Sequence, residues 1–203
     1  MKFIGLTGSI ATGKSTVARM FEEFGCYVID ADKLVHEIYK QGEEGYAKVV
    51  EVFGDEILDE NKNIDRKKLA QIVLKDKEKL KKLESIVHPI VEKKRNEILN
   101  KIAKSKKDAI VIYDVPLLFE KGMQDMFDCV IVVWTDKKTQ IKRLIKRNNL
   151  SKEEAEKRIN LQMSIDKKRE LADIVIDNSK SLDYTKKQVL SIIQGIKQNK
   201  LCT

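Results

Sequence analysis

The segment with the clearest chemistry is the octapeptide at residues 8–15. It reads Gly-Ser-Ile-Ala-Thr-Gly-Lys-Ser and fits the pattern Gly-x-x-x-x-Gly-Lys-Ser/Thr in full, with an apolar stretch before it and an amphipathic stretch after it. Glycines such as Gly8 and Gly13 let the backbone turn tightly, so that successive N–H groups point into one concavity. The helix expected to follow adds the positive end of its dipole. This combination predicts a loop that binds the phosphates of a nucleoside triphosphate.

Two side chains of this loop have the chemistry that phosphoryl transfer needs. Lys14 is expected to reach the β- and γ-phosphates, and the Ser15 hydroxyl is expected to ligate Mg²⁺. GTPases share the loop but usually carry Asn-Lys-x-Asp or Thr-Lys-x-Asp as a guanine signature, and the sequence has neither. We therefore expect ATP and Mg²⁺ as cofactors. The other loop contacts to the nucleotide are expected from Gly8, Ala11, Thr12, Gly13 and Thr16.

Carboxylates end two of the apolar stretches. Asp30 and Asp32 close the second stretch, where ligands bind in parallel sheets, and a kinase needs a carboxylate to orient the attacking hydroxyl and take its proton. Asp32 is the candidate base and Asp30 its strand-end partner, although both carboxylates can instead cap the next helix. Asp114 closes the third stretch at the Walker B position, which predicts a metal role; a purely structural hydrogen bond is the alternative.

The turn after Asp114 and the two histidines are candidates for binding the acceptor. Pro116, Leu117 and Leu118 form an apolar turn beyond a strand, which lines either an acceptor pocket or the core. His88, next to a proline that marks a break between helices, is expected to contact an acceptor phosphate. His36 is a candidate for the same contact, and for both residues the alternative is a structural role, because a lone histidine is more often structural.

A second mobile element is expected at residues 137–163. Arginines on a closing segment commonly stabilise the charge on a phosphoryl group in transfer. Arg143 and Arg147 are four residues apart and share a helical face, and Arg158 follows. Arg147 is the best candidate because it lies nearest the turn expected at residues 147–149, whereas a solvated basic face is the alternative. Ser151 begins a capping-box pattern that predicts a second helix.

Five short apolar runs predict the strands of a buried parallel sheet. Helical stretches alternate with them, which indicates a three-layer α/β fold, beginning with a helix at residues 14–24 that a glycine ends. The second and third strands are far apart, so residues 31–107 are expected to form a helical insertion that binds the acceptor. Residues 1–30 and 108–203 are expected to form the nucleotide-binding core. The expected strands are residues 2–7, 26–30, 109–114, 128–134 and 173–177.

The net charge and the cysteines limit which other classes of protein the chain can belong to. The 203 residues carry a net charge of +8, but the basic residues are interleaved with acidic ones, so most are expected on solvated helix faces rather than in a nucleic-acid site. No apolar run reaches the roughly twenty residues of a membrane span. Three widely spaced cysteines argue against a disulfide framework, and Cys26 and Cys129 are expected to be buried thiols. We expect a cytoplasmic monomer with no nucleic-acid or membrane partner.

The ordered motifs resemble those of the dephospho-CoA kinase family nearly end to end. The Asp-Ala-Asp, His-Pro and Pro-Leu-Leu-Phe-Glu motifs make the resemblance much more specific than the phosphate loop alone. The matching segments are residues 5–8, 13–16, 29–32, 86–89, 116–120 and 172–178, with Arg158 and Gln162.

The resemblance implies a P-loop kinase fold with a five-stranded parallel sheet, a helical substrate-binding insertion and a lid. It also implies ATP-dependent phosphorylation of the ribose 3′-hydroxyl of dephospho-CoA, the last step of coenzyme A synthesis. On this basis Asp32 is the catalytic base, Arg147 the lid arginine, and Asn178 lies where adenine is held. Where the family loop commonly has glycine, this chain has Ala11, which must lie at negative φ or carry strain.

Without the resemblance, the residues establish only a small-molecule kinase. Another nucleoside or nucleotide kinase of the same fold is then the nearest alternative. A basic nucleic-acid-binding ATPase would hydrolyse ATP in response to DNA or RNA, and a nucleotide-gated interaction protein would bind ATP without turnover.

Overall fold

The computed structural model describes residues 1–202. The chain divides into two compact units, one of Met1–Ile29 with the chain from Lys106 onward, and one of Asp30–Ser105. In the described part of the chain no helix has both the length and the apolar composition to span a membrane.

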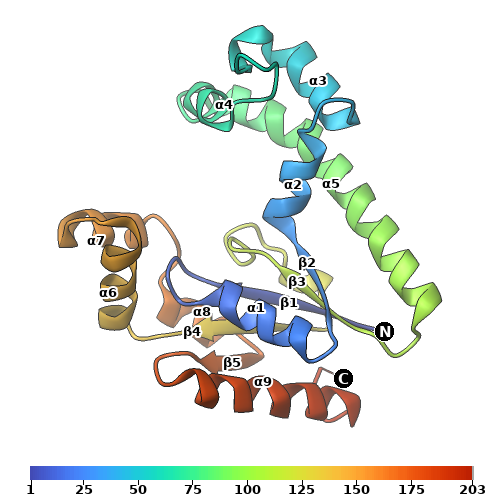
Figure 1. The fold of residues 1–203 in the computed structure, drawn as a ribbon, viewed down its shortest axis with the longest axis vertical. Helices are drawn as coiled ribbons and strands as arrows, with labels where there is room; N and C mark the ends of the chain where they lie inside the picture. The colour runs from blue at the N-terminus through green and yellow to red at the C-terminus, as the bar shows by residue number, and fades with distance from the viewer. Residues whose placement is uncertain (203) are drawn as a thin grey trace. The chain divides into compact units, whose positions relative to one another are not determined.

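The first unit is built on a five-stranded parallel sheet of order β2-β3-β1-β4-β5 (Figure 1). The strands are β1 Lys2–Gly8, β2 Tyr27–Asp30, β3 Ile110–Asp114, β4 Cys129–Trp134 and β5 Ile174–Asp177. All five predicted strands are confirmed, each boundary to within one residue. The central strands are almost wholly buried, which is why they read as continuous apolar runs rather than alternating ones.

Helices cover the sheet on both faces, so the predicted three-layer α/β fold is confirmed. The helices of this unit are α1 Lys14–Glu23, α6 Lys137–Asn148, α7 Lys152–Asn160, α8 Ile165–Leu171 and α9 Leu182–Lys197. One face packs against α1 and α9 through Val17, Phe21 and Val189 (Figure 1). On the other face, α8 packs against β4 and the segment 115–127 covers Gly5.

The chain end corrects the expectation about cysteines. Cys129 forms a disulfide with Cys202, with their Cα atoms 5.1 Å apart, so it is buried but not a free thiol. Helix α9 returns the chain towards the start of β4, and Leu201 packs against Gly195, which brings residues 73 positions apart in sequence together. Cys26 is confirmed as a buried free thiol, and burial raises its pKa to about 11.

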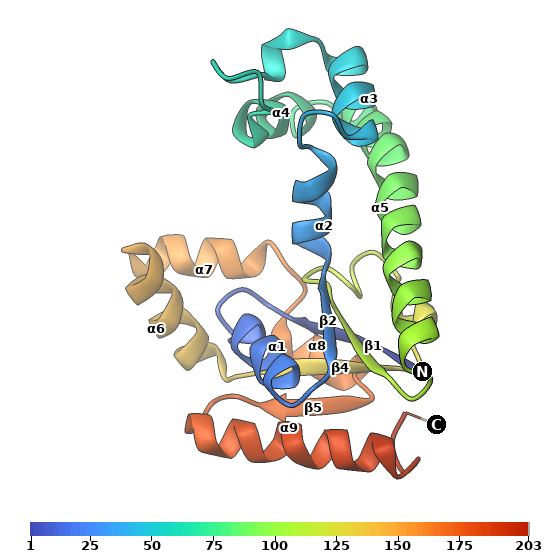
Figure 2. The same cartoon turned by 45° about the vertical axis from the view of Figure 1, so that its right-hand side comes forward.

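The second unit consists of helices. They are α2 Ala31–Ile38, α3 Glu44–Phe53, the 3-10 turn η1 Asp55–Ile57, α4 Arg66–Val73 and α5 Lys77–Ser105. Their apolar faces share a core that includes Ile38, Val49 and Leu69. The long helix α5 runs alongside α2 and α3 (Figure 2).

The helix break expected at Pro89 is wrong, because α5 continues through it. A proline inside a helix removes one backbone hydrogen bond and costs about 3 kcal/mol. Here Val87 and Ile90, on either side of it, are both buried in the core of this unit, while Pro89 itself is exposed. Packing of this apolar stripe therefore outweighs the local preference.

Candidate active site

The phosphate loop joins β1 to α1 through a turn that needs small residues. Gly13 precedes α1 with φ 93°, and a Cβ there would overlap the side-chain amide of Asn178. A Cβ on Gly8 would lie 2.7 Å from Thr12 Oγ1 and 3.0 Å from the Val133 carbonyl oxygen. The space around them thus requires both glycines of the motif, and the backbone conformation also favours glycine at position 13.

Two backbone conformations were expected for Ala11, and it adopts the strained one. Its φ is 63°, in the left-handed region where a Cβ clashes with the backbone. Its methyl group packs with Leu144 and Ile159 in a small apolar cluster that joins the loop to α6 and α7. This packing accompanies the strain and supplies a contact that a glycine would lack.

The loop carbonyls are held by side chains from outside the loop. The carbonyl of Gly8 accepts from Lys168 Nζ at 3.2 Å, and that of Ile10 accepts from Gln140 Nε2 at 2.7 Å. The carbonyl of Thr12 accepts from Asn178 Nδ2 at 2.8 Å. In a trans peptide the N–H points opposite to the C=O, so pinning these three carbonyls turns the following N–H groups the other way. Such an arrangement forms a concavity that binds anions.

The start of α1 adds to this anion site. In the part of the chain that the structure describes, no side chain caps the amino end of α1. Its first N–H groups are therefore available to a ligand, and the helix dipole favours a negative one. This is the arrangement expected for a bound phosphate.

Lys14 and Asp114 form an ion pair at the carboxyl ends of β1 and β3. The Asp114 side chain is almost fully buried, and Lys14 is partly buried. Asp114 thus stands at the predicted Walker B position, with the cation of the loop as its partner. A buried carboxylate requires such a partner, because an unpaired charge would be too costly to bury.

The hydroxyl of Ser15 and the carboxylate of Asp114 have the donor chemistry that suits a magnesium ion. Ser15 lies in the first turn of α1 with its side chain exposed. No group of three or more His, Cys, Asp or Glu side chains that could hold a metal occurs within residues 1–202. Mg²⁺ typically keeps several waters and binds through one or two protein groups plus substrate phosphates, so a hydroxyl and one carboxylate are enough.

Asp30 and Asp32 have different surroundings. Asp30 ends β2 and caps α2, accepting a hydrogen bond from the Lys33 N–H at 3.0 Å. Asp32 lies in the first turn of α2, two residues beyond the strand, and is exposed. The capping role considered for both carboxylates therefore applies to Asp30, and Asp32 remains the candidate for chemistry.

The turn after β3 divides between core and surface. Leu118, one of the candidates for the acceptor pocket, is fully buried and packs against Gly5, so it takes the alternative place in the core. Leu117 is exposed and Pro116 is half-buried. The Pro116 carbonyl accepts from Thr7 Oγ1 at 3.1 Å, which ties the turn to β1.

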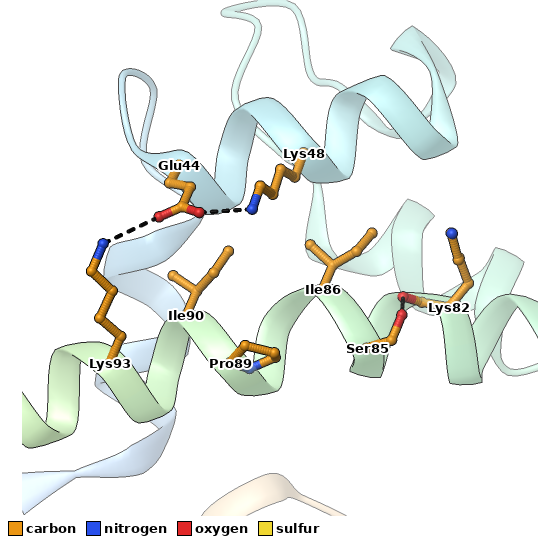
Figure 3. Close-up of a pocket in the computed structure, with 8 residues that line it drawn as sticks. All are labelled: Glu44, Lys48, Lys82, Ser85, Ile86, Pro89, Ile90 and Lys93. Atoms are coloured by element: carbon orange, nitrogen blue, oxygen red, sulfur yellow. Dashed lines mark hydrogen bonds and ion pairs between the residues drawn. The ribbon is translucent and has the colours of Figure 1, made fainter.

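The insertion contains a hollow of about 370 Å³ between α3 and α5 (Figure 3). Its floor is apolar, with Ile86, Pro89 and Ile90, and Glu44 at its rim lies 2.7 Å from Lys48 Nζ. This contact lowers the pKa of Glu44. The other residues that line it are Lys82, Ser85 and Lys93.

Both histidines lie in the insertion. His88 does not line the hollow; it is exposed, with its Nε2 4.0 Å from Glu84 Oε1. His36 is also exposed, near the end of α2.

The predicted helix pair at residues 137–163 is present as α6 and α7. Asn149, at φ 51°, ends α6, and Ser151 begins α7 with the predicted capping box, both of whose hydrogen bonds are present. Arg147 is exposed and donates to Asn148 Oδ1 at 2.9 Å. Arg143, one turn earlier, reaches the phosphate loop, donating to Thr12 O at 3.4 Å and to Asn178 O at 2.8 Å.

Sequence reasoning missed most of the residues that hold the loop. Asn178 was expected near adenine; its buried side chain donates to Thr12 and accepts from Thr185 Oγ1 at 2.9 Å. Gln162 appeared only as part of the family resemblance, yet its Oε1 accepts the Ile10 N–H at 2.9 Å. Gln140 and Lys168 carried no signal, because each is one polar residue among many in a charged helix.

A parallel α/β sheet, a phosphate loop at its central strand and a carboxylate at the end of β3 define a P-loop kinase. A comparison with family models matches residues 2–183 to dephospho-CoA kinase. The chain belongs to the dephospho-CoA kinase family.

Relatives and solved structures agree with this assignment. The chain is 46% identical to the dephospho-CoA kinase of Listeria innocua, covering 98% of this chain and 99% of that protein. It is 48% identical to that of Aquifex aeolicus, covering 97% and 98%. The dephospho-CoA kinase structure from Campylobacter jejuni has a TM-score of 0.72 at 32% identity, with 98% of each chain covered. The crystal structure of TT1252 from Thermus thermophilus has a TM-score of 0.81 at 31% identity, with 95% and 96% covered.

Proposed function

We propose that this enzyme transfers the γ-phosphoryl group of ATP to the ribose 3′-hydroxyl of dephospho-CoA, giving coenzyme A and ADP. The observation that carries the proposal is the phosphate loop, whose carbonyls at Gly8, Ile10 and Thr12 are all bound from outside. A loop held in this way presents its N–H groups to a triphosphate without rearrangement, which is how phosphoryl transfer is promoted.

On the nucleotide side, Lys14 exchanges Asp114 for the β- and γ-phosphates. Ser15 and Asp114 would hold Mg²⁺, which when bound would supply positive charge against the negative charge of the phosphates. Gly8, Ala11, Thr12, Gly13 and Thr16 supply the loop around the phosphates. Asn178, bonded to Thr12, keeps the loop in place on the side of adenine.

On the acceptor side, Asp32 orients the 3′-hydroxyl and accepts its proton. The exposed carboxylate has no capping duty, unlike Asp30, and stands just beyond the carboxyl end of β2, which supports this role. Pro116 and Leu117 contribute to the acceptor surface, and His88 contacts an acceptor phosphate. Arg147, free of the loop, reaches the transferring group when α6 and α7 close, and closure excludes water.

We also assign the two parts of the chain to the two substrates. Residues 1–30 and 108–203 bind ATP, with residues 137–163 as the lid, and residues 31–107 bind dephospho-CoA. The hollow between α3 and α5, apolar with a lysine-rich rim, suits part of an anionic acceptor. The enzyme works on this small molecule as a cytoplasmic monomer, without nucleic-acid or membrane partners.

A coupled ADP-release assay tests the proposal. The enzyme is supplied with ATP·Mg²⁺ and, in parallel, with dephospho-CoA, a panel of nucleosides and nucleoside monophosphates, single-stranded DNA, or RNA. We expect ADP release with dephospho-CoA, with the 3′-phosphorylated product identified by mass spectrometry. Faster turnover with a nucleoside or a nucleotide, or hydrolysis stimulated by nucleic acid, would refute it.

A further inference from the structure

Lys168, on α8, is a buried cation that the nucleotide and acceptor roles do not account for. Its side chain is 0% exposed, whereas that of the adjacent Lys167 is 57% exposed. Burying an ammonium group is costly unless the charge is paired and its N–H groups are hydrogen-bonded. The contacts of Lys168 therefore indicate why a cation is kept there.

The ammonium group of Lys168 has three acceptors from two segments of the chain, the phosphate loop and the turn at residues 116–120. Nζ lies 3.2 Å from the Gly8 carbonyl oxygen, 2.9 Å from that of Pro116 and 2.9 Å from Glu120 Oε1. An ammonium group has three N–H donors, so all of them are committed to the protein. Lys168 consequently has no donor left for a substrate, and its effect must pass through the groups that it holds.

Two of those groups belong to the reaction site. Gly8 ends β1 and begins the phosphate loop, and Pro116 begins the turn after β3 that we assign to the acceptor. Lys168 donates to the carbonyl oxygens of both, whereas the Thr7 hydroxyl donates to Pro116. A displacement of its ammonium group would therefore shift the loop and the turn relative to each other.

Glu120 extends the connection to the segment between α7 and α8. Its side chain is 22% exposed, and Oε1 also accepts the Met163 N–H at 3.0 Å. The Met163 carbonyl in turn accepts from Ser9 Oγ at 3.2 Å, inside the phosphate loop. The loop, the turn and the end of the lid segment thus share one hydrogen-bond network with Lys168 at its centre.

The charge of Lys168 acts on the same region as that of Lys14. Burial lowers the pKa of Lys168, Glu120 opposes this change, and the positive charge of Lys14 adds to the lowering. Two cations are thus close enough to influence each other, one with donors for phosphate and the other with none to spare. Lys14 is therefore able to bind phosphate, whereas Lys168 is able only to position the backbone groups that it contacts.

We propose that Lys168 is a positioning residue for phosphoryl transfer: through Gly8, Pro116 and Glu120 it fixes the phosphate loop relative to the turn at residues 116–120. The proposal rests on the proposed function, because it requires that the two segments serve the two substrates. Misplacing reacting groups by about 1 Å can cost roughly 10²-fold in rate, even when both substrates still bind.

The test uses the double variant Lys168→Met/Glu120→Gln, which removes the ammonium group without leaving an unpaired carboxylate, while the new side-chain amide oxygen can still accept from the Met163 N–H. We expect kcat to fall about 10²-fold while the Kd for ATP changes less than about threefold, because Lys14 and the loop N–H groups remain. The control is Lys167→Met on the same helix, which should behave as the parent enzyme does. Circular dichroism and Tm establish that each variant is folded.

Three results would overturn the proposal. They are a folded double variant with parental kcat, a change confined to the KM for ATP, and a loss of kcat no larger than the unfolded fraction explains. If the double variant does not fold, Lys168→Gln decides: about a tenfold loss of kcat supports positioning, and unchanged kcat refutes it. If the parent enzyme does not use dephospho-CoA, the proposed function fails, and the same variants are measured with the acceptor that it does use.

Discussion

Around the phosphate loop, buried side chains such as Lys168, Gln140 and Asn178 donate to backbone carbonyls. In the unit of residues 30–105, many charged side chains instead pair with each other at the surface, as Lys40 does with Glu37. Surface ion pairs contribute little and hold no fixed geometry, whereas a buried donor on a carbonyl fixes the backbone. The backbone of the first region is therefore fixed before a ligand binds. In the second region, which we propose binds the acceptor, the surface charges are not fixed in this way.

Of the substitutions considered, a change at Asp32 should cause the largest loss of activity with the smallest loss of stability. Asp32 is exposed and makes no cap, so Asp32→Asn should lower kcat by roughly 10²- to 10⁴-fold through loss of the base while barely changing the fold. The measurement is steady-state kinetics with dephospho-CoA, together with a thermal melt. Asp30→Ala is the matched control, since losing the α2 cap should cost about 1 kcal/mol of stability. Near-parental turnover in Asp32→Asn would remove Asp32 from the mechanism.

The two arginines of α6 test whether the lid binds or catalyses. Arg147→Ala should lower kcat roughly 10²- to 10³-fold, because the guanidinium group no longer reaches the transferring phosphoryl group. Arg143→Ala should mainly raise the KM for ATP by about 10- to 10²-fold, because Thr12 and Asn178 lose a charged donor. Initial rates over a grid of both substrates separate the two effects. Unchanged kcat/KM for both substrates in Arg147→Ala would refute its assignment.

The disulfide should stabilise the core without affecting chemistry. Cys202→Ser opens the link between residues 129 and 202, which should cost about 2–4 kcal/mol of unfolding free energy in the oxidised protein. The kcat measured well below Tm should stay at the parental value, since the link lies at the amino ends of the strands and the loop at their carboxyl ends. Urea unfolding with and without dithiothreitol measures the effect. If dithiothreitol lowers the urea midpoint of the parent protein no more than it lowers that of Cys202→Ser, the disulfide is not what stabilises the chain end.

Local pattern was enough to predict the elements that depend on neighbouring residues. The five strands, α1 and the Ser151 capping box all follow from short-range periodicity or from residues three apart. The phosphate loop was found for the same reason, since its residues are contiguous. The place of Asp114 at the Walker B position required only the further rule that parallel strands end at the same edge of the sheet, whereas its ion pair with Lys14 was not predicted.

Features that depend on tertiary contacts were not predictable. Pro89 has a strong local preference to break a helix, and only the shared core of the insertion shows why α5 continues. Arg143 and Arg147 lie on one face of α6, so spacing alone did not show that Arg143 is the one on the loop. Lys168 reads as one more lysine in a charged helix, because its partners lie 160, 52 and 48 positions away.

Ala11 gives the smallest expected effect and the finest test of how firmly the loop is held. At φ 63° an alanine costs roughly 1–2 kcal/mol relative to its preferred conformations, and glycine does not. Ala11→Gly relieves this strain but loses the methyl contacts to α6 and α7 and frees the unfolded chain, so we expect a net gain of at most about 1 kcal/mol. That gain corresponds to a rise in Tm of about 2–4 °C for a chain of this size.

The matched control for Ala11→Gly is the reverse change at Gly25. Gly25 has φ 84°, and apart from Gly25 and its two chain neighbours no atom of the described residues lies within 4 Å of the place where a Cβ would stand. Gly25→Ala therefore meets the same backbone strain with no compensating contact and should lower Tm. If Ala11→Gly lowers Tm as well, the methyl contacts outweigh the strain, and the cluster with Leu144 and Ile159 becomes part of what holds the loop. If instead Ala11→Gly raises Tm while kcat falls, the alanine serves catalysis at the expense of stability. The conformation of the phosphate loop is then selected for its ligand rather than for the stability of the fold.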